Sequence, residues 1–243
     1  MTVTLVLTLL VAIGYGVQTT AGFGAGLILV TTGAQLIELP TLLALLLPLS
    51  LLQTSWVSFR NRQFIHRPIL FRRILPFMGT GVVLGYLLAS RLSGMTILKQ
   101  LLGAFVVLLA LRELWMVHRG TPAKPGTALA STVAIFGAGI MHGIYTTGGP
   151  LLVYGLGREK LDRARFRATI TVVWLILNVG LVATFAVEGR YTTEVLQQLG
   201  ILSLGIPVGI LGGERVFARV SERTFRQVVY GLLAIAGVPL ALG

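Results

Sequence analysis

Six long apolar runs constrain this chain more than any other feature of its sequence. Each run holds about 17 to 22 residues, a length that as a helix matches the hydrocarbon core of a bilayer. Lipid offers no hydrogen-bond partners, so a segment in that core has to satisfy its own backbone groups, and a helix does so. The sequence therefore predicts transmembrane helices near residues 41–59, 74–90, 97–116, 166–187, 195–213 and 225–242.

The composition supports this prediction and limits the alternatives. Of 243 residues, 55% are apolar and only 12% are charged, which predicts an all-α polytopic membrane protein in the cell membrane. A net charge of +12 would suggest nucleic-acid binding in a soluble protein. Here the basic residues lie in loops between apolar runs, so membrane topology explains the charge and we expect no nucleic-acid partner.

Two further apolar regions, 3–37 and 128–157, are interrupted by polar, glycine-rich segments at 18–26 and 142–150. Each region could cross the membrane once or could enter and leave on the same face. With single crossings, the 20 Lys and Arg residues divide almost evenly between the two faces. With hairpins, one face receives all of them except Arg91, Lys99 and Arg190. The positive-inside rule therefore favours two re-entrant hairpins, with the basic face cytoplasmic and both termini outside.

This topology makes the two halves of the chain inverted repeats, residues 1–120 and residues 121–243. Each half then has one broken hairpin and three full spans, an arrangement known from secondary transporters. Matching residues recur between the halves at offsets that drift slowly along the chain. The pairs are Gly22 with Gly143, Gln53 with Asn178, Gly81 and Gly85 with Gly209 and Gly213, and Gly103 with Gly231.

The first break offers glycines and small polar side chains at bilayer depth. Glycine lets the backbone turn sharply and approach a solute closely. A solute-facing loop would use the side chains and backbone of Gln18, Thr19, Thr20, Gly22, Phe23 and Gly24. A tightly packed helix kink is the alternative interpretation.

The second break predicts an anion site. Gly148 and Gly149 precede Pro150, and proline fits the first turn of a helix, so a short helix should begin here. Its N-terminal amides and the positive end of its dipole favour an anion. Hydroxyl groups and a further glycine stand beside it, at Gly143, Tyr145, Thr146 and Thr147. If a second helix begins near Gly24, two N-termini converge on one small oxyanion.

His142 is the titratable side chain that lies deepest in the predicted membrane region. It could bind an anion as imidazolium, carry a coupled proton, or stay neutral on a backbone carbonyl. Gln53 and Asn178 lie within predicted spans, where an amide needs a partner. They could flank the site or form structural hydrogen bonds between helices.

Several chemistries lack the residues that they require. The sequence has no cysteine and three widely spaced histidines, so we expect no metal site and no cofactor. No serine is paired with the His and Asp of a catalytic triad, so we expect no enzyme.

The two motifs resemble those of the TauE/SafE sulfite exporter family of membrane permeases. Gly22-Phe-Gly-Ala-Gly26 is similar to the family's first motif, and the segment from His142 to Tyr154 is similar to the second. The resemblance implies movement of small, often sulfur-containing anions such as sulfite, sulfoacetate or other organosulfonates. Tyr145, Thr146 and Thr147 depart from the glycine-richer form of the second motif.

We therefore expect a secondary transporter or exporter of a small anion, held at the midplane between the hairpin tips, with one half rocking against the other. A passive channel with the same site is the first alternative, and a membrane-embedded enzyme or assembly subunit is the second. A coupled proton and a homodimer are left open by the sequence.

Overall fold

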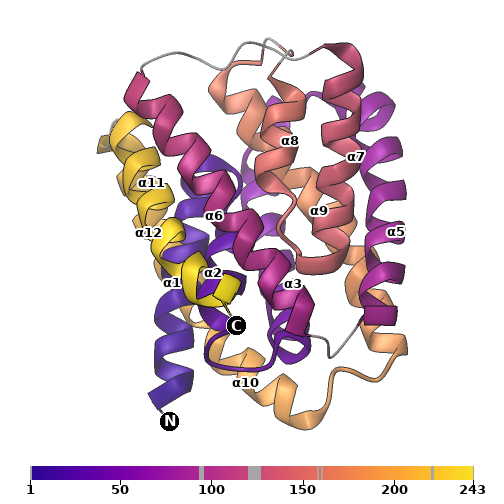
Figure 1. Cartoon of the computed structure of the whole chain (residues 1–243), viewed down its shortest axis with the longest axis vertical. Helices are drawn as coiled ribbons and strands as arrows, with labels where there is room; N and C mark the ends of the chain where they lie inside the picture. Colours follow the sequence, from indigo (N-terminus) through magenta and orange to yellow (C-terminus); the bar gives the residue numbers. More distant parts are fainter. Residues whose placement is uncertain are drawn as a thin grey trace.

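The computed structural model describes residues 2–92, 96–119, 127–157, 159, 161–219 and 222–242. All regular elements in these ranges are helical (Figure 1). The first half contains α1 (Thr2–Ala21), α2 (Ala25–Gly33), α3 (Leu39–Arg60), η1 (Arg62–Phe64), α4 (Arg67–Ile69), η2 (Leu70–Ile74), α5 (Leu75–Leu92) and α6 (Thr96–Arg119). The second contains α7 (Ala128–Tyr145), α8 (Gly149–Leu156), α9 (Arg163–Val187), α10 (Thr193–Ser203), α11 (Gly205–Arg219) and α12 (Glu222–Leu242).

Both broken regions fold as hairpins of unequal helices. α1 runs from one end of the bundle into its interior, and α2 returns toward the same end (Figure 1). α7 and α8 do the same from the opposite end. We call α1 with α2 the first hairpin, and α7 with α8 the second hairpin. Their tips, the segments 18–26 and 142–150 that contain the two breaks, therefore approach each other inside the bundle.

The chain is an all-α polytopic membrane protein, as predicted. Among the described residues, six helical stretches are long and apolar enough to cross a membrane: Thr2–Ala21, Leu39–Arg60, Arg67–Arg91, Ala128–Tyr145, Arg163–Val187 and Thr193–Arg215. They include α1 and α7, the longer helices of the two hairpins, and the predicted helices over 97–116 and 225–242 are present as α6 and α12. The predicted helix over 195–213 is also divided, at Leu204, into α10 and α11.

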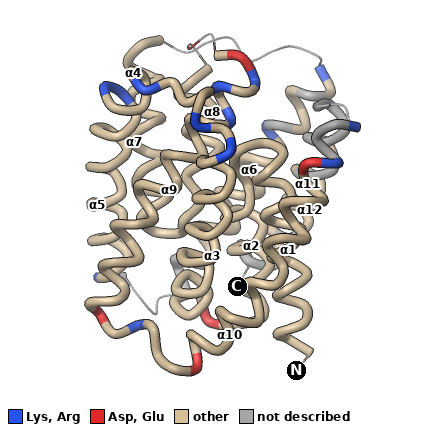
Figure 2. The backbone as a smooth tube through the Cα atoms, turned by 180° about the vertical axis from the view of Figure 1, so that it is seen from behind, with Lys and Arg blue, Asp and Glu red and all other residues tan. Residues whose placement is uncertain are grey.

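Charge is segregated along the long axis of the bundle. Figure 2 shows Lys and Arg gathered at the end that holds α4 and the C-terminal ends of α8 and α11, with few at the end near α10. This agrees with the charge division that hairpins predict. Lys124, Arg158 and Lys160, which were counted in it, lie outside the described residues, as does the boundary between the halves at 120 and 121.

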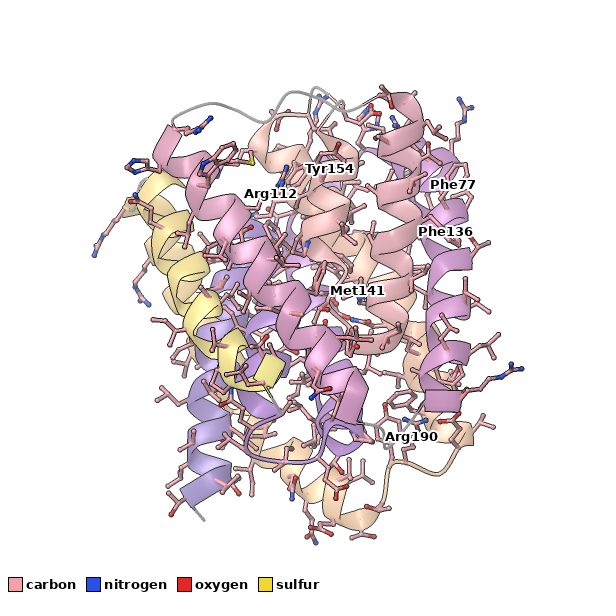
Figure 3. All side chains as sticks on the ribbon, viewed as in Figure 1. Phe77, Arg112, Phe136, Met141, Tyr154 and Arg190 are labelled. Atoms are coloured by element: carbon pink, nitrogen blue, oxygen red, sulfur yellow. The ribbon has the colours of Figure 1, made fainter. Side chains whose placement is uncertain are left out.

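The two halves interlock instead of lying side by side. The most extensive helix pairs are α5 with α7, α6 with α12, α1 with α11 and α3 with α9, and each joins one half to the other. Phe77 of α5 and Phe136 of α7 mark the first of these pairs in Figure 3. The halves also meet between α6 and α8, where the Arg112 guanidinium carbon lies 5.6 Å from the ring centroid of Tyr154.

Glycines permit the closest of these crossings. A Cβ on Gly81 or Gly85 of α5 would lie 2.3 or 2.2 Å from a carbonyl oxygen of α7. A Cβ on Gly209 or Gly213 of α11 would lie 2.5 or 2.4 Å from a carbonyl oxygen of α1. These two pairs of glycines therefore allow close helix crossing. The α5 glycines of the first half thus pack on α7 of the second hairpin, and the α11 glycines of the second half pack on α1 of the first hairpin.

Candidate functional site

A small buried cavity lies where the two hairpin tips meet. The centres of water-sized molecules can occupy about 30 Å³ of it. This volume suits two or three waters or one small anion. Polar groups on its wall come from both hairpins and from α3 and α9: Tyr15, Gln18, Gly24, Gly26, Ser50, His142, Thr146, Thr147, Gly149 and Asn178. Its apolar wall is formed by Phe23, Leu27, Leu29, Leu46, Leu47, Pro150 and Trp174.

The tips touch so closely that side chains are excluded at two positions. A Cβ on Gly26 would lie 2.3 Å from the Thr146 carbonyl oxygen, and one on Gly149 would lie 2.9 Å from Phe23 Cβ. The backbone of one hairpin therefore packs directly on the other. This explains why small residues stand at both breaks.

Two helices begin at the cavity. The first intrahelical bond of α2 is from Ile28 N–H to the Gly24 carbonyl, and that of α8 is from Leu152 N–H to the Gly148 carbonyl. The amides that precede these bonds, at residues 25–27 and at 149 and 151, have no acceptor within their own helix. No Asp, Glu, Lys or Arg is among the residues lining the cavity. The amides and helix dipoles are therefore the groups available there to offset a negative charge.

The first tip is held by hydrogen bonds with three other helices, α3, α9 and α11. Gln18 Nε2 donates to Gln53 Oε1 and Gln53 Nε2 donates to Thr19 Oγ1, both at 3.0 Å. Thr20 Oγ1 donates to the Gly213 carbonyl at 3.0 Å. From α9, Trp174 Nε1 donates to the Gly22 carbonyl at 2.8 Å, and the Arg167 guanidinium donates to the Thr19 carbonyl at 3.1 Å.

The second tip carries His142, which bonds to α9. His142 Nε2 lies 2.8 Å from Asn178 Oδ1, and Asn178 Nδ2 donates to Ser50 Oγ at 2.9 Å. The imidazole stacks on Trp174 with ring centroids 5.1 Å apart. Both His142 and Thr147 are buried, with 2% and 3% exposure. Within the described residues, His142 Nδ1 and Thr147 Oγ1 have no hydrogen-bond partner.

The structure brings eight of the fifteen predicted site residues to the cavity wall: Gln18, Phe23, Gly24, His142, Thr146, Thr147, Gly149 and Asn178. The other seven stand behind it. Thr19, Thr20, Gly22 and Gln53 hold the first tip through the bonds described above. Gly143 packs on the Val82 carbonyl of α5 and Gly148 packs on the Ala138 carbonyl of α7. Tyr145 is buried in the apolar core.

The observed ends of the helices align the two breaks at a different sequence offset from the pairing of Gly22 with Gly143. α1 ends at Ala21 and α2 begins at Ala25, while α7 ends at Tyr145 and α8 begins at Gly149. Gly22 therefore corresponds to Thr146, not to Gly143, and both have a positive φ, of 85° and 56°. In this register Gln18 corresponds to His142, and each bonds to the mid-helix amide of its own half, Gln53 or Asn178.

Sequence reasoning missed several residues at the site. Trp174, which lies outside both sequence motifs, lines the cavity and bonds to the first tip. Arg167 was counted from the sequence only among the basic residues of the cytoplasmic face, at the start of the predicted helix 166–187, but it lies in the second turn of α9 and reaches Thr19. Tyr15 and Ser50 have common residue types for membrane helices. No local motif marks them, because only the tertiary contacts bring them to the cavity.

A metal site is not formed by the residues that the structure describes, since no group of three His, Asp or Glu lies together among them. The arrangement instead joins a multi-pass helical bundle to a buried polar cavity between opposed half-helices. Such a fold and site define a membrane transporter.

Comparison with known proteins identifies its family. Residues 6–240 match the family model for the sulfite exporter TauE/SafE, and the chain belongs to this family. It is 28% identical over 234 residues to the "probable sulfite/organosulfonate exporter TauE" of Cupriavidus necator, covering 93% of this chain and 88% of that protein. It is 24% identical over 168 residues to the "probable inner membrane transporter protein TsaS" of Comamonas testosteroni, covering 69% of each. No solved structure matches. The protein is thus a membrane transporter and not an enzyme.

Proposed function

We propose that this protein is a secondary transporter that moves a small sulfur-containing oxyanion, such as sulfite or a small organosulfonate, across the cell membrane. The observation that carries the proposal is the cavity between the tips, where two helices begin and no charged side chain lines the wall. Free amides at helix N-termini favour a negative charge without selecting one anion over another. The names of the family and of the Cupriavidus necator relative supply the sulfur chemistry.

In this proposal the anion is bound by the leading amides of α2 and α8 together with the hydroxyl of Thr147. Gln18, His142 and Asn178 supply the polar side of the pocket, while Phe23 and Trp174 close its apolar side. Thr19, Thr20, Gly22 and Gln53 act indirectly, by holding the first tip in place. The cavity volume of about 30 Å³ favours an inorganic oxyanion in this conformation. A sulfonate with an organic group would need the tips to separate.

We also propose that residues 1–120 and 121–243 are inverted repeats, with the basic end cytoplasmic and both termini outside. Reciprocal packing supports the repeat, since α5 of the first half lies on α7 and α11 of the second half lies on α1. This packing also changes the motion that we expect. Rigid units that each combine helices of both halves would move, because glycine crossings tie α7 to α5 and α1 to α11.

Reconstitution of the purified protein tests this function. We expect sulfite to raise its melting temperature more than acetate does, and we expect sulfite loaded inside liposomes to accelerate entry of labelled sulfite. Counterflow of this kind requires alternating access, so a linear, non-saturating flux without counterflow would identify a channel instead. Stabilisation by acetate and other carboxylates alone would overturn the sulfur assignment. Thiosulfate, sulfoacetate and taurine in the same screen define the size limit.

A further inference from the structure

The hydrogen bonds of Asn178 determine which ring nitrogen of His142 carries the proton. The amide nitrogen of an asparagine can only donate, and its amide oxygen can only accept.

The amide nitrogen of Asn178 donates to Ser50 Oγ at 2.9 Å. The amide oxygen of Asn178 therefore faces His142 Nε2 at 2.8 Å. An amide oxygen cannot donate, so Nε2 carries a hydrogen. In the neutral ring, Nδ1 is then left as a bare acceptor.

This acceptor is buried on the wall of an anion cavity and has no partner among the described residues. The surrounding groups do not provide an alternative. α2 and α3 contribute no ionisable side chain to the wall, α1 contributes Tyr15, and α8 contributes none. On α9, the guanidinium of Arg167 bonds to Thr19 and Asn61. A fully deprotonated oxyanion offers only acceptors. Its oxygens would therefore lie against the Nδ1 lone pair with no hydrogen between them, and the two acceptors would repel each other.

We propose that each anion enters the cavity with one proton, which is shared between His142 Nδ1 and a ligand oxygen. The proton comes from solvent, and no covalent bond between heavy atoms forms or breaks. A ligand with its own O–H, such as hydrogen sulfite, brings the proton itself. A sulfonate stays unprotonated in water, so the proton then binds to Nδ1, and the imidazolium donates to the anion. Asn178 and Ser50 are positioning residues that fix the tautomer.

The inference rests on the proposed anion transport and names a coupling ion for it. Proton uptake can be measured by calorimetry of the purified full-length protein in two buffers that have different heats of ionisation. The probes are methanesulfonate, which cannot bring a proton, and sulfite. At about pH 8 we expect uptake of about one proton per methanesulfonate bound and an affinity that falls about tenfold per pH unit above neutrality.

Variants separate this inference from simpler roles of the histidine. His142→Gln keeps a polar side chain but cannot be charged, so methanesulfonate should bind with near-zero proton uptake and no pH dependence. Asn178→Asp should hold the ring charged before the ligand arrives. Proton uptake then falls, while affinity is retained to higher pH. Ser50→Ala removes the acceptor that orients the Asn178 amide and should lower uptake, whereas Tyr191→Phe, which removes a buried hydroxyl with no partner among the described residues, should leave it unchanged.

The outcomes distinguish the two proposals. Binding of methanesulfonate without proton uptake, or an unchanged pH dependence in both His142→Gln and Asn178→Asp, would refute proton coupling and leave anion transport intact. If neither sulfite nor methanesulfonate binds the wild-type protein, both proposals fail together.

Discussion

The first hairpin is fixed at its tip, whereas the second hairpin is fixed at its open end. Hydrogen bonds from Arg167, Trp174 and Gln53 hold the first tip, while apolar contacts such as Gly14 on Leu29 hold its arms. In the second hairpin, Arg73 pairs with Glu159 and donates to Ser131 at 2.8 Å near the open end. Its tip keeps two unpartnered polar atoms, His142 Nδ1 and Thr147 Oγ1.

This difference indicates which hairpin is adapted to bind the solute. Hydrogen bonds that are already made within the protein leave little for a ligand to add, whereas buried unpaired groups gain a partner when a ligand binds. The first tip is therefore a preformed wall, and the second tip carries the groups whose bonding is completed by the anion. Four variants test this comparison, in descending order of expected effect.

The largest effect is expected where the two tips meet. Gly26→Ala places a Cβ 2.3 Å from the Thr146 carbonyl oxygen, so the tips must separate. We expect the loss of most sulfite counterflow and a decrease of about 1–3 kcal/mol in the free energy of unfolding. Gly180→Ala is the matched control, because nothing lies within 4 Å of its Cβ. Equal counterflow in the two variants would show that the tips do not depend on close contact.

The open end of the second hairpin comes next. Arg73→Gln removes the ion pair with Glu159, and we expect a decrease of about 1–2 kcal/mol in unfolding free energy, measured as a lower melting temperature. Protease cleavage near residue 157 should increase as α8 loosens. The double exchange Arg73→Glu with Glu159→Arg should recover part of the loss. No recovery would mean that Arg73 acts through Ser131 instead of Glu159.

The tip of the first hairpin has a comparable test in Arg167. Arg167→Gln shortens the side chain and removes its bonds to Thr19 and Asn61, which should lower the unfolding free energy by about 1 kcal/mol. Sulfite counterflow should fall because the preformed wall is loosened. Arg165→Gln is the control, since Arg165 is exposed and pairs with Asp162 in the adjacent loop. A larger effect from Arg165→Gln would contradict a fixed first tip.

The smallest effect gives the sharpest contrast between the tips. Thr147→Val removes a hydroxyl that has no partner, so stability should be unchanged or slightly higher, while sulfite affinity falls about fivefold. Thr20→Val removes a bond to the Gly213 carbonyl, so stability should fall by about 1 kcal/mol with a smaller change in affinity. Melting curves with and without sulfite measure both quantities. The reverse pattern would exchange the roles that we give to the two tips.

Much of the fold could be predicted because its causes are local in the sequence. Apolar length sets the helices, charge division distinguishes hairpins from single crossings, and the spacing of Gly81 with Gly85 and of Gly209 with Gly213 marks close crossings. The division of α10 from α11 at Leu204 was missed although it has a local cause, because Pro207 in the first turn of α11 has no N–H to donate to the carbonyl four residues earlier, and Gly205 precedes it.

The candidate site was predictable only in part. Polar residues at the breaks stand out against an apolar background, so His142, Thr147 and Gln18 could be found. The direction in which each side chain turns depends on neighbours far along the chain. Gly143 therefore faces α5 and not the cavity, while Trp174 and Tyr15 face the cavity without any local signal.

The glycine crossing between α1 and α11 has a consequence for biosynthesis. Thr20 bonds to a residue 193 positions later in the chain, so the first hairpin emerges from the ribosome long before the helix that completes its surroundings. Until α11 has been translated, the polar groups of the first hairpin must find other hydrogen-bond partners, in the insertion machinery or in a temporary arrangement of the chain. A truncated product that ends before α11 should consequently be a substrate for membrane quality-control proteases, and co-production of the missing C-terminal segment should rescue it.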